Sequence, residues 1–88
     1  MTLHYTFENI QRALRSLATE DGSLRDRVSE AHRYLLRVSN TEGFEEEFTT
    51  IRECLSSVEN ENYNDVEESE LKIVATTIMD MFEKIPRE

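Results

Sequence analysis

Apolar residues recur along this chain at alternating spacings of three and four, a pattern typical of amphipathic helices. The most regular stripe lies in residues 23–38 and comprises Leu24, Val28, Ala31, Leu35 and Val38. Charged side chains occupy the positions between them. The stripe predicts a helix with one buried face, and it carries little information about chemistry.

Three further stripes predict three more helices. The first of these is Phe7, Ile10, Leu14 and Leu17; the next is Phe44, Phe48, Ile51, Leu55 and Val58; the last is Leu71, Val74, Ile78, Met81 and Ile85. We therefore predict an all-α fold, a small antiparallel bundle with helices at about 6–19, 23–38, 43–58 and 67–85. The length of 88 residues predicts a single helical domain over residues 1–88.

The junction between the first two predicted helices leaves an alternative. The heptad spacing continues across Asp21 and Gly22, so one helix over residues 6–38 would give a three-helix fold. We favour four helices because an interior Gly costs about 1 kcal/mol and Asp21 would lie on the apolar seam. Thr6 is the expected N-cap of the first helix, and Asp21 or Ser23 that of the second.

Charge is distributed unevenly along the chain. The net charge is −9, but residues 1–38 carry +1 and residues 39–88 carry −10. This balance disfavours nucleic acid as a ligand of the second half. It also suggests that arginines of the first half pair with acids of the third and fourth helices.

Other sequence features indicate the redox compartment and whether the chain enters a membrane. Cys54 is the only cysteine, which excludes an internal disulfide and fits a reducing compartment. The N-terminal residues do not resemble a secretory signal, and no apolar run approaches the roughly 18 residues of a membrane span. We expect a cytoplasmic protein, bacterial or phage-like, that does not insert into a membrane.

The chain offers little for catalysis or metal binding. His4, His32 and Cys54 share no spacing typical of metal ligands, and the polar loop after Glu59 lacks the Gly and Glu of a calcium loop. Cys54 borders an apolar stripe, as a buried thiol commonly does. We expect no enzyme activity, no cofactor and no metal.

The first two predicted helices and their Gly-containing turn resemble a helix–turn–helix motif in outline. Arg25, Arg27, Arg33 and Arg37 of the second helix would contact the phosphates or bases. Asp26 lies on the same surface, and the net charge is strongly negative. Weak DNA binding through this helix is therefore the third-ranked hypothesis.

The leading hypothesis is a protein–protein interaction module that is not an enzyme and that binds a protein partner or a second copy of itself. Its candidate partner surface consists of apolar or aromatic residues outside the main stripes: Leu36, Tyr63, Ile73 and Met79. The second hypothesis is an inhibitor that mimics nucleic acid and occupies a basic partner, by analogy of charge and size with phage-encoded inhibitors. Its candidate acidic surface is Glu45, Glu46, Glu47, Glu59, Glu61, Asp65, Glu67, Glu68 and Glu70.

Overall fold

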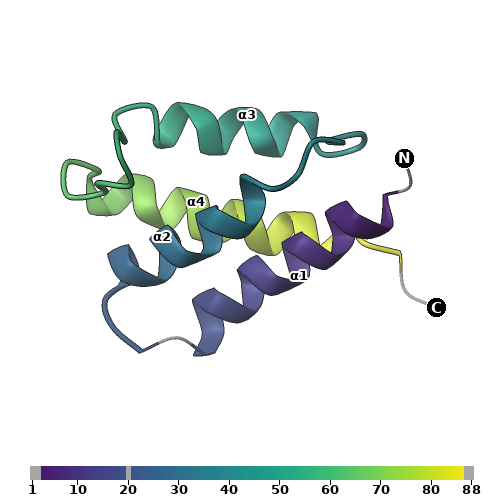
Figure 1. The fold of residues 1–88 in the computed structure, drawn as a ribbon, viewed down its shortest axis with the longest axis horizontal. Coiled ribbons are helices and arrows are strands. Elements are labelled where there is room, and N and C mark those ends of the chain that lie inside the picture. The colour runs from purple at the N-terminus through teal and green to yellow at the C-terminus, as the bar shows by residue number, and fades with distance from the viewer. Residues whose placement is uncertain (1–2, 20, 87–88) are drawn as a thin grey trace.

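Four α-helices follow one another in the computed structural model, which describes residues 3–19 and 21–86. They are α1 (His4–Thr19), α2 (Leu24–Leu35), α3 (Glu45–Cys54) and α4 (Glu68–Glu83). Successive helices run antiparallel (Figure 1), and the described residues contain no β-strand. The predicted all-α, four-helix fold is confirmed. No helix in this part of the chain is both long and apolar enough to cross a membrane.

The junction between α1 and α2 is a true break, so the three-helix alternative is wrong. Gly22 has a φ of +113°, a conformation that other residues rarely adopt. Ser23 then caps α2: its hydroxyl accepts a hydrogen bond from the backbone N–H of Asp26, and the Asp26 carboxylate accepts one from the N–H of Ser23. This reciprocal capping box fixes the first turn of α2.

The predicted helix ends differ from the observed ones. Helix α1 begins two residues before Thr6, so Thr6 is not its N-cap; instead, Thr6 is buried and its hydroxyl donates to the Asn40 carbonyl at 2.6 Å. The other three helices are shorter than predicted at both ends. Apolar residues beyond these ends, such as Val58, still pack on the core from turns. Periodicity therefore identified core positions more reliably than helix boundaries.

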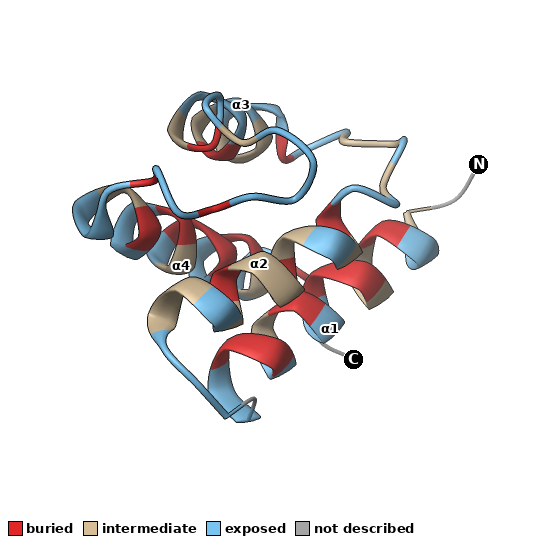
Figure 2. Cartoon of the chain, turned by 60° about the vertical axis from the view of Figure 1, so that its left-hand side comes forward, coloured by how far each residue is buried: buried red, intermediate tan, exposed pale blue. Residues whose placement is uncertain are grey.

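Helix α4 packs against the other three helices, and its buried face forms the centre of the core. Leu71, Val74, Ile78 and Met81 are each at most 1% exposed. Buried segments face inward on all four helices (Figure 2). The complete set of buried apolar residues is Ile10, Ala13, Leu17, Val28, Ala31, Leu35, Phe44, Ile51, Leu55, Tyr63, Val66, Leu71, Val74, Ile78, Met81 and Ile85.

Helix α3 contacts fewer neighbouring helices than the other three do. Among the described residues its only helix neighbour in backbone contact is α4, whereas α2 packs on both α1 and α4. Ile51 is the one fully buried residue within α3. An ion pair between Glu47 and Lys84, at 2.7 Å, joins the start of α3 to the end of α4. The hydrogen bond from Lys84 holds the pKa of the Glu47 carboxyl below its usual value.

We expect Gly22→Ala to lower the free energy of unfolding by about 1–3 kcal/mol, because the positive φ strains any L side chain and the new Cβ would lie 2.9 Å from Asp26 Oδ2. Gly43→Ala is the control: its φ is +86°, but no atom lies within 4 Å of the new Cβ. Urea unfolding monitored by circular dichroism measures both. An equal loss in the two variants would mean that the contact with the capping box adds nothing.

Candidate functional site

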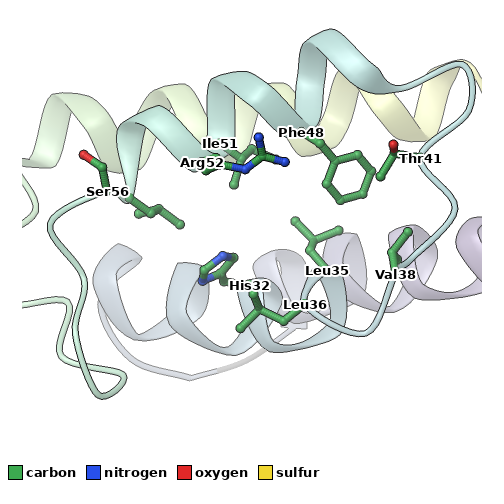
Figure 3. Close-up of a pocket in the computed structure, with 10 residues that line it drawn as sticks. His32, Leu35, Leu36, Val38, Thr41, Phe48, Ile51, Arg52 and Ser56 are labelled. Atoms are coloured by element: carbon green, nitrogen blue, oxygen red, sulfur yellow. The ribbon is translucent and has the colours of Figure 1, made fainter.

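A groove lies between α2 and α3, which are both in backbone contact with α4 but not with each other. Its volume is about 520 Å³. Side chains of α2 and α3 point toward one another across it (Figure 3). Buried Leu35, Ile51 and Leu55 connect it to the core. The full lining is His32, Leu35, Leu36, Val38, Thr41, Phe48, Ile51, Arg52, Leu55 and Ser56.

The charge of the groove differs from that of the whole chain. No Asp or Glu occurs among its ten lining residues, although the chain contains 19 acids. Arg52 is the one permanently charged side chain of the lining, and His32 is the one other ionisable group. The groove is therefore an apolar strip with one positive charge on an acidic protein.

Leu36 is the most exposed large apolar residue that the structure describes, with 66% of its surface open to solvent. It follows the last residue of α2 as its C-cap and lies at the edge of the groove. An isolated exposed Leu is ordinary on a protein surface. Here it adjoins an apolar groove and so extends one continuous apolar strip.

His32 is held in the wall of the groove by Tyr63. Its Nδ1 lies 2.7 Å from the Tyr63 hydroxyl, and the two rings meet edge to face with centroids 5.8 Å apart. The hydroxyl donates to Nδ1 when the neutral ring carries its proton on Nε2. Burial lowers the pKa of His32 and, together with the nearby Glu61 carboxylate, raises that of Tyr63.

Two of the three arginines of α2, Arg25 and Arg27, bind backbone carbonyls instead of the expected acids of α3 and α4, whereas Arg33 pairs with Glu61 in the connection to α4. Arg25 donates to the carbonyls of Tyr63 and Val66, at 3.0 and 2.6 Å. Arg27 donates to the Leu17 carbonyl, at 3.0 Å, in the last turn of α1. A cation there also complements the helix dipole. Both guanidinium groups therefore have structural partners, which weakens the case for α2 as a DNA-reading helix.

The four residues of the candidate partner surface do not share one patch. Tyr63 is 6% exposed and belongs to the core. Ile73 and Met79 are exposed on α4, six residues and so about 120° apart around the helix. Leu36 alone lines the groove.

The candidate acidic residues lie at two ends of the α3–α4 pair. Glu45, Glu46 and Glu47 form the first turn of α3. The others lie in the connection to α4 or in its first turn, and the antiparallel course of the two helices places that region at the opposite end (Figure 1). Glu47 pairs with Lys84 and Glu61 pairs with Arg33.

Cys54 is a free thiol beside α4. Burial, reinforced by the Glu70 carboxylate, raises its pKa to about 11. The thiol is therefore protonated at neutral pH and is a poor nucleophile. In the described residues, no three His, Cys, Asp or Glu side chains are grouped as metal ligands would be.

Comparisons with protein-family models, with curated proteins and with solved structures found no match. The groove, with its apolar lining and exposed Leu36, is the surface feature that best indicates a function. Sequence reasoning missed it because periodicity shows that a helix has a buried face without showing which helix covers it. The one available signal was Leu36, which projects away from the main stripe of its helix.

We expect Arg25→Lys to lower the free energy of unfolding by about 1–3 kcal/mol, since a lysine cannot donate to the carbonyls of Tyr63 and Val66 with the paired geometry of a guanidinium group. Arg33→Lys is the control: the ion pairs of Arg33 with Glu30 and Glu61 are exposed, so its change should stay within about 0.5 kcal/mol. Urea unfolding compares them. Equal losses would show that the carbonyl contacts of Arg25 contribute little.

Acid should destabilise the fold through His32. The folded protein keeps this ring neutral below the ordinary pKa of 6.5, whereas the unfolded chain protonates it there. Its stabilising contribution is therefore complete above that pKa and is lost as the pH falls toward the lowered value. Between about pH 7.5 and 5.5, wild type should lose more unfolding free energy than His32→Gln.

The matched control for this acid effect is His4→Gln, which changes an exposed histidine of α1 and should behave like wild type. An NMR titration of the His32 ring measures its pKa directly. The same pH dependence in His32→Gln and wild type would contradict the prediction.

Proposed function

We propose that this protein is a protein-binding module, without catalytic activity, that holds an amphipathic helix of a partner protein in the groove between α2 and α3. The observation that carries the proposal is the groove, an apolar strip free of acids and edged by the exposed Leu36. Apolar surface of this kind gains free energy when a partner covers it.

The form of the groove favours a helix as its occupant. Its two walls are antiparallel helices without backbone contact with each other, so a helix laid along the groove would contact side chains of both. The wall of α3 runs from Phe48 to Leu55, seven residues or about 10 Å. That length accommodates nearly two turns of a partner helix, with apolar side chains at positions i, i+4 and i+7.

The charges of the protein define the partner further. Arg52 is the permanent charge of the lining, so the bound helix should carry a carboxylate opposite it. The rest of the surface belongs to a chain of net charge −9, which favours basic residues on the partner outside the groove. Such residues would accelerate association at low salt.

A displayed library of amphipathic helical peptides, screened against the purified protein, supplies the probe. Fluorescence anisotropy of a selected peptide then compares wild type, Leu36→Glu and the control Ile73→Glu, which adds the same charge at an exposed apolar site of α4. We expect Leu36→Glu to weaken binding at least about tenfold, because burying a Leu contributes about 1.5–3 kcal/mol. Ile73→Glu should change affinity less than about twofold, since Ile73 lies outside the groove.

Three results would contradict the proposal. One is the absence of any peptide whose NMR shift changes map to His32, Leu36, Phe48 and Arg52. Another is an equal loss of affinity in both variants. The third is a dimer, seen by light scattering, that Leu36→Glu dissociates; that result would assign the groove to a second copy of the chain.

A further inference from the structure

A second cleft lies between α1 and α2, and its character is the opposite of the groove. Its volume is about 280 Å³, and it is lined by Arg12, Arg15, Ser16, Thr19, Tyr34 and Arg37. Three of these six side chains are arginines and none is an acid, in a chain of net charge −9. None of the six lines the α2–α3 groove.

Within residues 3–19 and 21–86, two of the three guanidinium groups have no ion pair with an acid. Arg12 pairs with Glu8 at 2.6 Å, which balances its charge. Among the described residues, no ion pair is found for Arg15 or Arg37. Two positive charges that no described acid pairs with therefore face the cleft.

One of these two donor groups is positioned by a neighbouring aromatic ring that leaves its N–H groups available. The Arg37 guanidinium lies over the Tyr34 ring, 5.2 Å from its centroid, so an aromatic face positions it while its N–H groups stay available. The hydroxyls of Ser16 and Thr19 donate to the carbonyls of Arg12 and Arg15, one turn earlier in α1. The protons of these two hydroxyls are used in this way, so the guanidinium groups are the charged donors that a ligand would meet.

We propose that this cleft binds the phosphate groups of a small phosphorylated ligand, with Arg15 and Arg37 as its main contacts. The planar guanidinium group matches phosphate oxygens with paired hydrogen bonds, and it stays charged at all physiological pH values. A small ligand fits better than a nucleic acid, because the cleft is short and the acidic surface elsewhere repels a long phosphate backbone.

The test is titration of the full chain with pyrophosphate at low ionic strength, followed by NMR and isothermal calorimetry. We expect saturable shift changes at Arg15, Thr19 and Arg37. The double variant Arg15→Gln/Arg37→Gln should bind pyrophosphate at least about tenfold more weakly, because it loses the charged hydrogen bonds that both guanidinium groups would donate to the phosphate oxygens.

The control, Arg33→Gln/Lys72→Gln, removes the same charge from exposed sites outside the cleft and should stay within about twofold of wild type. Circular dichroism checks that all variants fold. Three results would overturn the proposal: no saturable binding, equal weakening in the control, or tighter binding of a single-stranded oligonucleotide than of pyrophosphate. The last would assign the cleft to nucleic acid.

Discussion

The buried face of α4 is the contact on which the remaining structure depends. Leu71, Val74 and Ile78 are almost completely removed from solvent, and α4 is in backbone contact with each of the other helices. For α3 it is the only such neighbour among the described residues. Helices α2 and α3 are both in backbone contact with α4 but not with each other, and the groove lies between them.

Helix α2 determines where α4 begins. Arg25 binds the carbonyls of Tyr63 and Val66, and His32 bonds the Tyr63 hydroxyl, so two residues of α2 hold the connection that leads into α4. That connection turns sharply at Asn60 and Glu61, which both have positive φ. The N-cap of α4, Glu67, makes no capping hydrogen bond through its side chain. The start of α4 is therefore fixed by contacts with α2 more than by its own capping residue.

Much of this fold could be predicted from the spacing of apolar residues, and much of the site could not. The stripes identified the number of helices and most of the core, since a buried helical face leaves a mark of period 3.6. Tyr63 lies in a connection without such a period, and the residue that its hydroxyl bonds, His32, is 31 residues away. The carbonyls bound by Arg25 carry no formal charge, so the charge distribution along the sequence could not indicate them. It predicted carboxylates as the partners of this arginine instead. The groove depends on which faces meet, and periodicity does not contain that information.

The bonds from Arg25 to main-chain oxygen have a consequence for how this sequence can change over generations. Every amino acid supplies a carbonyl, so the bonds from Arg25 do not restrict which residues stand at positions 63 and 66; side-chain burial does, and at position 63 so does the bond with His32. An arginine bound to a carboxylate would lose its partner through one mutation. Exposed acids in this region, such as Glu59 and Glu67, can therefore be replaced without loss of the bonds from Arg25 to the backbone.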